Sequence, residues 1–186
     1  MPRLIITTSR NTSNRVRSFA RDLWSVLPGS DRFNRGGMGL SELASRIHQS
    51  GARAAVIISM WHGNPGDLSL IDPDGSELAV IRVESALLRR EIVASPRTRV
   101  TSVSPIAVKS DSPDRVQELA LILSDLLECE VEEHTAPPRD GPRGECTPWL
   151  EPAPSGRVIW THYHAYDGTE IGPRIRVKEV RKSNIE

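Results

Sequence analysis

The sequence predicts an α/β protein made of two similar halves, each with a strand, a helix and further strands. Short apolar runs that are typical of buried strands alternate with stretches whose apolar residues recur every three or four positions, as in helices. This succession occurs twice, although no residue-level repeat accompanies it. The length of 186 residues suffices to bury a hydrophobic interior. The chain could form one large domain or two small ones that share a core, and the repeated succession places the pseudo-repeat halves at approximately 1–84 and 85–186.

The first half opens with an apolar run, Leu4–Thr8, that predicts a buried strand. Thr12 or Ser13 has the side chain of a helix N-cap, and Pro28-Gly29 ends the helical pattern that follows. The apolar face of this expected helix consists of Val16, Phe19, Ala20, Leu23 and Leu27.

A second helix is expected in the same half. A short strand near residues 32–34 leads through Gly36-Gly37 to a helix that begins at about Ser41 and ends at Gly51. Its inward residues would be Leu43, Ala44 and Ile47.

Three strands complete the first half. Residues 54–60 are almost entirely apolar, as expected for a strand in a sheet that is covered on both faces. After a turn at residues 63–66, the segments 67–71 and 77–83 resemble a hairpin joined through residues 72–75.

The second half repeats the strand and the helix. Residues 99–109 are strand-like, and Ser112 is expected to start a helix with Pro113 in its first turn. A further strand is expected at residues 130–132. The apolar stripe of the helix consists of Val116, Leu119, Leu123 and Leu126.

The end of the chain is expected to contain a loop and a hairpin. Residues 135–154 are rich in Pro, Gly and charge, which predicts a mobile surface loop. Residues 157–166 and 175–180, with Asp167-Gly168 between them, predict a final pair of strands.

The composition excludes several classes of protein. With 38% hydrophobic and 26% charged residues, the chain resembles a globular protein, and its apolar runs are too short to span a bilayer. The N-terminal residues lack the pattern of a secretory signal, so we expect a cytoplasmic protein. Cys129 and Cys146 form no Cys-x-x-Cys pair, which argues for reduced thiols rather than for disulfides or a Cys-rich zinc site.

The net charge of zero conceals a gradient along the chain. Residues 1–60 contain nine Arg against Asp22, Asp31 and Glu42, a net charge of +6, so the remainder carries −6. Arg outnumbers Lys by 21 to 3, a bias that suits RNA but that genomic base composition or heat adaptation also produces. The first half is therefore the expected anion-facing side.

Three motifs resemble those of a known family. Residues 5–10, with the sequence Ile-Ile-Thr-Thr-Ser-Arg, precede a helix that carries Arg15, Arg17, Ser18, Phe19, Asp22 and Leu23. Residues 34–37 and 63–66 read Asn-Arg-Gly-Gly and Gly-Asn-Pro-Gly, and residues 170–174 read Glu-Ile-Gly-Pro-Arg. In this order they resemble the Brix-domain ribosome biogenesis proteins, and in particular minimal archaeal members. Residues 73–76 and Trp160-Thr161 depart from the family pattern.

The resemblance implies a fold of two similar α/β halves, each related to an anticodon-binding domain, in a single Brix domain over residues 1–186. It also implies a non-catalytic role in the processing and assembly of ribosomal RNA. The partners would be ribosomal RNA or its precursor, with ribosomal or assembly proteins as further candidates. No cofactor and no membrane contact are implied.

The candidate RNA-binding residues lie mainly around the first helix. Free backbone N–H groups at its start could hold a phosphate with Arg10 and Arg15 beside it, and Arg17 and Arg21 share one face of the helix. The alternative is a solvated face in which these arginines pair with Asp22 or Asp31. The full candidate set is Ser9, Arg10, Asn11, Arg15, Arg17, Arg21, Arg32, Asn34, Arg35, Arg174 and Arg176.

Two parts of this set have an equally plausible alternative. Gly36-Gly37 beside Arg35 would let a ligand approach the backbone, or would simply form a flexible turn. Arg174 and Arg176 alternate to one side of the last strand, where they would bind phosphate or keep an edge strand soluble.

Other motifs favour structural explanations over chemical ones. His162 and His164 share a strand face, but no close pair of further ligands supports a zinc site, so we expect none. Trp61 and Trp149 could stack on bases, although core or partner contacts are the commoner use of such residues. Ser41 follows a Gly-x-Ser pattern that lacks the closing Gly of a nucleophile elbow, and it suits a helix cap better.

The expected function is therefore that of an RNA-binding factor without a catalytic site. A second possibility is a protein scaffold, in which residues 111–151, with 11 acidic residues and three Arg, dock a basic partner. An RNA-processing hydrolase is a third possibility, but the carboxylates show no convergent constellation.

Overall fold

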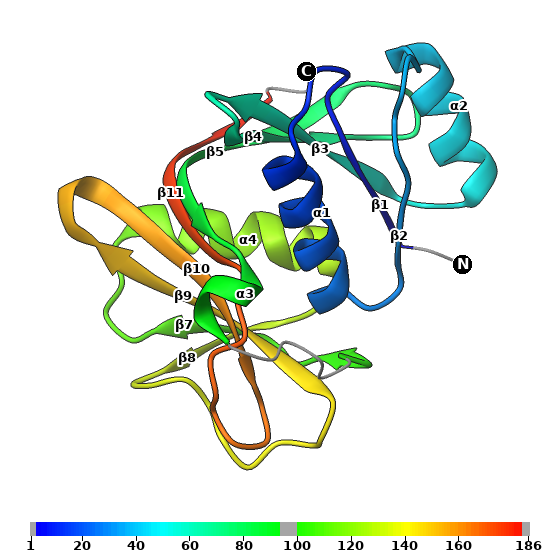
Figure 1. Ribbon diagram of the computed structural model, residues 1–186. Helices are drawn as coiled ribbons and strands as arrows, with labels where there is room; N and C mark the ends of the chain where they lie inside the picture. Colours follow the sequence, from blue (N-terminus) through cyan, green and yellow to red (C-terminus); the bar gives the residue numbers. More distant parts are fainter. Residues whose placement is uncertain (1–2, 94–99, 184–186) are drawn as a thin grey trace.

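The computed structural model describes residues 3–93 and 100–183, which form one curved mixed sheet with helices on both faces (Figure 1). The elements are β1 (Leu4–Thr8), α1 (Asn14–Val26), β2 (Ser30–Arg32), α2 (Leu40–Ser50), β3 (Ala54–Trp61), β4 (Asn64–Ile71), β5 (Glu77–Leu87), α3 (Arg89–Ile92), β6 (Ser102–Val103), β7 (Ile106–Lys109), α4 (Asp114–Leu127), β8 (Val131–His134), β9 (Glu145–Ala153), the 3-10 turn Pro154–Gly156, β10 (Arg157–His164) and β11 (Arg174–Lys182). The expected α/β class is confirmed.

The strand order is the same at both ends of the sheet. The order is β2-β1-β3-β4-β5-β11-β10-β9-β7-β8, with β6 beside β9. At one end, β1 lies between its parallel neighbours β2 and β3, and the antiparallel strands β4 and β5 follow. At the other end, β7 lies between its parallel neighbours β8 and β9, and the antiparallel strands β10 and β11 follow. The two series meet where β5 pairs with β11. The expected boundary between residues 84 and 85 falls within β5. The division into duplicated halves related to anticodon-binding domains stays a prediction.

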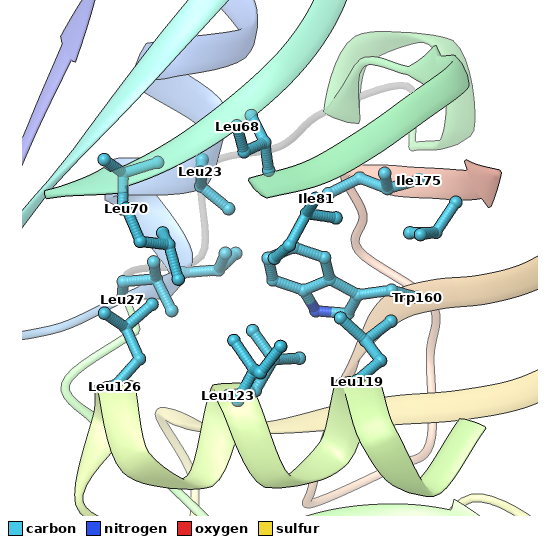
Figure 2. Close-up of a cluster of buried hydrophobic side chains, with 14 of the residues drawn as sticks. Leu23, Leu27, Leu68, Leu70, Ile81, Leu119, Leu123, Leu126, Trp160 and Ile175 are labelled. Atoms are coloured by element: carbon cyan, nitrogen blue, oxygen red, sulfur yellow. The ribbon is translucent and has the colours of Figure 1, made fainter. Parts of the chain in front are cut away.

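The two series of strands share one hydrophobic core. Apolar side chains of α1 and α4 meet those of β4, β5, β10 and β11 in the hollow of the sheet (Figure 2). Leu23 from α1 is 1% exposed, and Leu123 from α4 is also 1% exposed. The ring of Trp160 on β10 lies between Ile81 of β5 and the leucine side chains of α4, and it is 2% exposed. Burial of both helices against one sheet therefore joins the two ends of the chain into one unit.

The opposite face of the sheet is covered by α2. Leu43 and Ile47 are fully buried against Ile5, Ala55 and Ile57. Because side chains alternate along a strand, the neighbours of these strand residues point into the α1–α4 core instead. Both faces of β3 are therefore covered, which explains why residues 54–60 are almost entirely apolar, as the sequence predicted.

The predicted ends of the helices are only partly correct. Ser13 caps α1 as expected, because its Oγ accepts a hydrogen bond from the backbone N–H of Val16 at 3.1 Å. Ser41 does not cap α2, since Gly39 is the N-cap and Ser41 lies in the first turn with its side chain exposed. Pro113, rather than Ser112, is the N-cap of α4, so this helix begins one residue later than predicted.

Some strand boundaries also differ from the predictions. The strand expected at residues 32–34 lies at Ser30–Arg32, and the one expected at residues 130–132 is Val131–His134. The strand-like region 99–109 forms the short strands β6 and β7, and its first residue, Arg99, lies outside the described residues.

The prediction of a surface loop over residues 135–154 is wrong for its second part. Residues 145–153 form β9, and its central residues, Cys146 to Leu150, are all buried. β9 pairs with β10 along one side and with β6 and then β7 along the other. Pro148, which lacks a backbone N–H, lies where the neighbouring strand changes from β6 to β7.

None of the helices in the described part of the chain has the length and apolar character that crossing a bilayer requires.

Candidate nucleic-acid interface

Five of the candidate residues meet at one edge of the sheet. β1 is parallel to β2 and β3, so the carboxyl ends of these strands lie together. The loop after β1 continues along this edge, where the backbone N–H of Ser9 donates to the carbonyl of Ile58 at 2.9 Å. The carboxyl edge of parallel strands is the common position of ligand sites in α/β proteins. The candidates at this edge are Ser9, Arg10, Asn11, Asn34 and Arg35.

Arg10 and Arg35 converge on one backbone carbonyl. The Nε atoms of both side chains donate to the carbonyl oxygen of Met38, at 3.4 Å and 2.8 Å. Burial lowers the pKa of Arg35, and the nearby charge of Arg10 lowers it further. The ion pairs formed within residues 3–93 and 100–183 include neither arginine. Two like charges therefore lie together without a carboxylate, which favours the binding of an anion.

The backbone beside this pair is open. Gly36 has a φ of +57°, and a Cβ atom placed on Gly36 or on Gly37 would meet no other atom within 4 Å. A ligand could therefore approach the backbone here, which is one of the two uses predicted for this glycine pair.

The outer face of α1 carries a second group of candidates. Arg17 and Arg21 are exposed and lie opposite the buried Phe19 and Leu23. Arg17 donates to the side-chain oxygen of Asn14 at 2.5 Å. Among the described residues, neither arginine forms an ion pair, so the alternative in which they pair with Asp22 or Asp31 is not observed.

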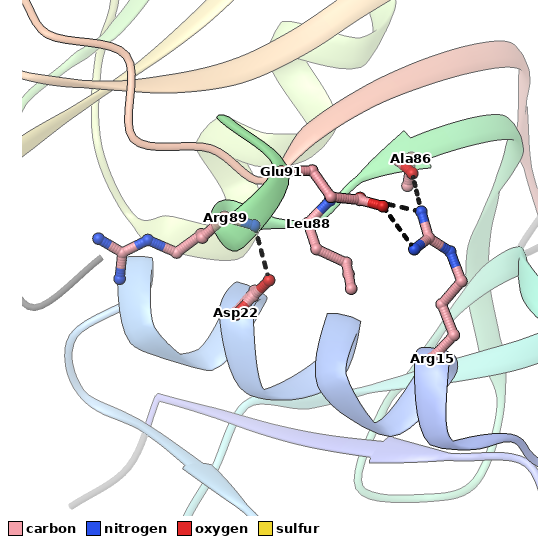
Figure 3. A network of polar contacts seen from close by, with 6 residues as sticks. All are labelled: Arg15, Asp22, Ala86, Leu88, Arg89 and Glu91. Carbon is pink, nitrogen blue, oxygen red and sulfur yellow. Dashed lines mark hydrogen bonds and ion pairs between the residues drawn. The ribbon is translucent and has the colours of Figure 1, made fainter. Parts of the chain in front are cut away.

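Arg15, in contrast, is held by groups within the protein (Figure 3). Its guanidinium donates to both carboxylate oxygens of Glu91, at 2.8 Å and 3.0 Å, and to the carbonyl of Ala86 at 2.9 Å. The hydrogen bonds and charge of Arg15 lower the pKa of Glu91. Since its donors face the junction between β5 and α3, we revise the predicted phosphate contact of Arg15 to a role in joining the two ends of the sheet.

Asp22 also stabilises this junction. Its Oδ2 accepts a hydrogen bond from the backbone N–H of Arg89 at 2.8 Å (Figure 3). Burial raises the pKa of Asp22, although the hydrogen bond from Arg89 opposes this shift. The Arg89 side chain is 4% exposed and donates to the carbonyl of Ile171 and to the hydroxyl of Ser25. The sequence does not reveal Arg89 and Glu91 as residues of this junction, because nothing in their local pattern shows which distant segment they contact.

Arg174 and Arg176 are neutralised by nearby carboxylates. Arg174 donates to both carboxylate oxygens of Glu170 at 2.6 Å. Arg176 donates at 2.6 Å to Glu84, which also accepts from Arg157 at 3.0 Å. β11 lies at the centre of the sheet, so the alternative in which these residues protect an edge strand is wrong. We therefore remove both arginines from the candidate interface.

Arg32 lies on β2, which is an outer strand of the sheet. Its Nε atom is buried and finds no hydrogen-bond partner among the described residues. Asn34 follows in the exposed loop toward Arg35. Both residues stay candidates, on the flank of the edge that carries Arg10.

The aromatic candidates differ sharply in exposure. Trp61, the last residue of β3, is 70% exposed. Trp149 is 2% exposed, and its indole N–H donates to Glu151 at 2.9 Å, so it has no face for a ligand. Trp24 was not among the stacking candidates, but it is 43% exposed and lies one turn beyond Arg21 on α1.

His162 belongs to the protein interior rather than to a metal site. Its ring is fully buried, its Nδ1 donates to the carbonyl of Pro173 at 2.9 Å, and burial lowers its pKa to about 4. His164, two residues further along β10, is partly buried. In the part of the chain that the structure describes, no three His, Cys, Asp or Glu side chains come close enough to hold a metal ion.

Known proteins that are similar to this chain include members of the family that its motifs resemble. A protein from Aeropyrum pernix, named a probable Brix domain-containing ribosomal biogenesis protein, is 40% identical over 72 residues, which are 39% of this chain and 40% of that protein. A protein of the same name from Thermococcus kodakarensis is 34% identical over 92 residues, which are 48% of this chain and 44% of that protein. This chain is related to the Brix-domain proteins. No protein-family model matches it.

A similarity at lower identity extends over the whole chain. The U3 small nucleolar ribonucleoprotein protein IMP4 of Saccharomyces cerevisiae is 24% identical over 195 residues, which cover all of this chain and 63% of that protein. The chain thus matches less than two thirds of the length of each of these three relatives.

Two solved structures show the same fold. The crystal structure of a probable ribosomal biogenesis protein from Aeropyrum pernix superposes with a TM-score of 0.74 at 26% identity, over 99% of this chain and 98% of that one. An archaeal Imp4-like protein gives a TM-score of 0.67 at 22% identity, over 97% and 99% of the two chains.

Proposed function

We propose that this protein is a cytoplasmic ribosome biogenesis factor that binds ribosomal RNA or its precursor through its first half and catalyses no reaction itself. The observation that carries this proposal is the distribution of ion pairs. Arg10, Arg17, Arg21 and Arg35 have no carboxylate partner among the described residues, whereas the candidates of the last strand are paired. Guanidinium groups without a carboxylate partner are suited to phosphate contacts, and the names of the relatives point to ribosome biogenesis.

These four arginines form the proposed basic face. Arg17 and Arg21 extend from α1, which starts directly after the loop that carries Arg10. Arg35 approaches the same loop from the other side, because it shares the carbonyl of Met38 with Arg10. One backbone of RNA running along the first turns of α1 could therefore contact several of these groups together.

RNA affinity as a function of salt tests this proposal. With a structured ribosomal RNA fragment, the logarithm of the association constant should fall linearly with the logarithm of salt concentration, with a slope that reports roughly three to six phosphate contacts. Arg17→Glu/Arg21→Glu should weaken binding at least about tenfold and flatten the slope, since two contacts become repulsive.

A matched control separates a local contact from overall charge. Lys109→Glu/Lys178→Glu introduces the same change of net charge at two exposed positions of the second half. This variant should bind RNA far more tightly than the Arg17→Glu/Arg21→Glu variant does. Equal losses in the two variants, or no RNA binding by the wild-type protein at low salt, would contradict the proposal.

A second candidate function is a scaffold that docks a basic ribosomal or assembly protein. The observation that favours it lies at the other edge of the sheet, where β8 is the outer strand and exposes Glu132 and Glu133. Under this alternative, Glu132→Lys/Glu133→Lys abolishes capture of the basic protein, while Arg17→Glu/Arg21→Glu leaves that capture intact.

A further inference from the structure

We propose that the edge carrying Arg10 binds a single-stranded RNA segment, with one unpaired base stacked on Trp61 and a phosphate of the same segment against Arg10 and Arg35. This inference rests on the proposed function and adds to it the class of RNA and the residue that distinguishes single strand from duplex.

Three loops meet at this edge. The loop after β1 contacts the turn between β3 and β4 on one side, because the hydroxyl of Ser13 donates to the carbonyl of Gly63 at 2.7 Å. On its other side, the same loop contacts the segment between β2 and α2 through Arg10 and Met38. Trp61 and Arg35 therefore flank one short loop, and Arg10 projects from that loop.

Trp61 is displayed by the backbone rather than packed. It ends β3 and pairs with Asn64 across the turn, where His62 has a φ of +47°. The His62 ring lies against the indole edge-on, with centroids 4.6 Å apart and planes at 83°. Trp61 is 70% exposed, so most of its indole surface is available to a partner.

The charge of the surrounding loops decides in favour of a nucleotide over an acidic or basic protein surface. Residues 9–14, 33–39 and 59–66 contain Arg10, Arg35 and His62 but no Asp or Glu. They are also rich in Asn and Ser, whose side chains donate to phosphates and to base edges. Burial and, to a smaller extent, the charge of Arg10 lower the pKa of Arg35, and a phosphate between Arg10 and Arg35 would offset the repulsion between the two charges.

Stacking on Trp61 requires a base whose face is accessible. Bases in a duplex already stack on their neighbours, whereas the bases of single strands and loops can lie on an aromatic ring. The phosphate contacts are common to both forms of RNA. Trp61 should therefore contribute to the binding of single strands alone.

The test measures the affinity of Trp61→Ala and Trp61→Phe for an unstructured RNA of about ten nucleotides and for its duplex with the complementary strand. Trp61→Ala should weaken single-strand binding about tenfold, while Trp61→Phe, which keeps an aromatic face, should stay within about threefold of the wild type. Duplex binding should be unchanged in both variants. Arg10→Gln/Arg35→Gln should flatten the salt dependence of single-strand binding by about two contacts.

The control replaces another exposed aromatic residue. Tyr166 is 46% exposed in the second half, and Tyr166→Ala should bind both RNAs as the wild type does. All variants are compared by their urea unfolding midpoints, since a change at an exposed position should alter stability by little.

Two failures are distinguishable. If the wild-type protein binds RNA and Arg17→Glu/Arg21→Glu abolishes binding, but Trp61→Ala binds single strands normally, this inference is overturned and the proposed function stands. An equal loss of duplex and single-strand binding in Trp61→Ala also overturns it. If the wild-type protein binds neither RNA, the proposed function and this inference fail together.

Discussion

A core substitution in α4 tests whether both ends of the sheet form one cooperative unit. Leu123 is 1% exposed and packs in the cluster that also contains Leu23 and Leu27 of α1 (Figure 2). Leu123→Ala removes three buried carbon atoms and leaves a cavity between the two helices, which should lower the free energy of unfolding by about 3 kcal/mol. This corresponds to a change on the order of 100-fold in the ratio of unfolded to folded protein.

Hydrogen exchange of individual backbone segments measures this effect at both ends of the sheet. In a single cooperative unit, the slowest amides exchange through global unfolding. Leu123→Ala should then accelerate exchange in β1 and β3 by the same factor as in β7 and β9, although Leu123 lies on the helix that follows β7.

The matched control is Leu121→Ala, in the same helix. Leu121 is 54% exposed, so its replacement should change the free energy of unfolding by less than about 0.5 kcal/mol. If Leu123→Ala accelerates exchange in β7 and β9 but leaves β1 and β3 at the rate of the wild type, the reasoning from a shared core is refuted.

Two further predictions concern the polar contacts. A double-mutant cycle of Arg15→Ala and Glu91→Ala, followed by urea unfolding, should give a coupling of about 1 kcal/mol, because the pair is bidentate but both side chains are about one third exposed; a coupling near zero would show that the pair does not join α1 to α3. The folded-state pKa of His162, about 4, lies below its ordinary value of 6.5, so its contribution to stability is complete above pH 6.5 and is lost as the pH falls toward 4. The free energy of unfolding should decrease by about 2 kcal/mol more between pH 8 and pH 5 in the wild type than in His162→Gln, and equal decreases would contradict the buried, neutral ring.

Local patterns predicted α1, α2 and α4 well because their signals are local, whereas the short helix α3 was not predicted. Ser13 is a side-chain N-cap, and Gly51 ends α2 with a positive φ of +72°, as a left-handed C-cap does. The apolar stripes of α1 and α4 are buried as expected. The start of α2 was misplaced, because a Ser near the start of a helical pattern does not show whether the preceding Gly39 takes the N-cap position instead.

β9 shows where local composition fails. The residues around β9 are rich in Pro, Gly and charge, which is typical of loops. A loop was therefore predicted, although Cys146, Trp149 and Leu150 are apolar. The strand forms because β10 and β7 both supply backbone partners, and those partners are distant in sequence. Tertiary pairing of this kind is not visible in a window of a few residues.

Residue type and motif selected the candidate arginines, but they did not show which of these arginines pair with carboxylates of the protein. Charge and motif identified the arginines of the first helix, yet only the tertiary contacts separate Arg15, which binds Glu91, from Arg17, which faces solvent. In the same way, Arg174 donates to the carboxylate of Glu170, whereas Arg10 donates to a backbone carbonyl. Arginines that are alike in sequence thus differ in what they can bind.

This division gives α1 two tasks on different faces. Arg15 and Asp22 attach it to the segment between β5 and α3, while Arg17 and Arg21 remain on its outer face. The position of the basic face relative to the rest of the sheet is therefore determined by contacts of the same helix. Under the proposed function, a weakened junction should reduce RNA affinity even though none of the proposed RNA-contacting groups is removed. Arg15→Ala should accordingly lower affinity less than Arg17→Glu/Arg21→Glu does, and it should leave the salt slope unchanged, because the number of phosphate contacts stays the same.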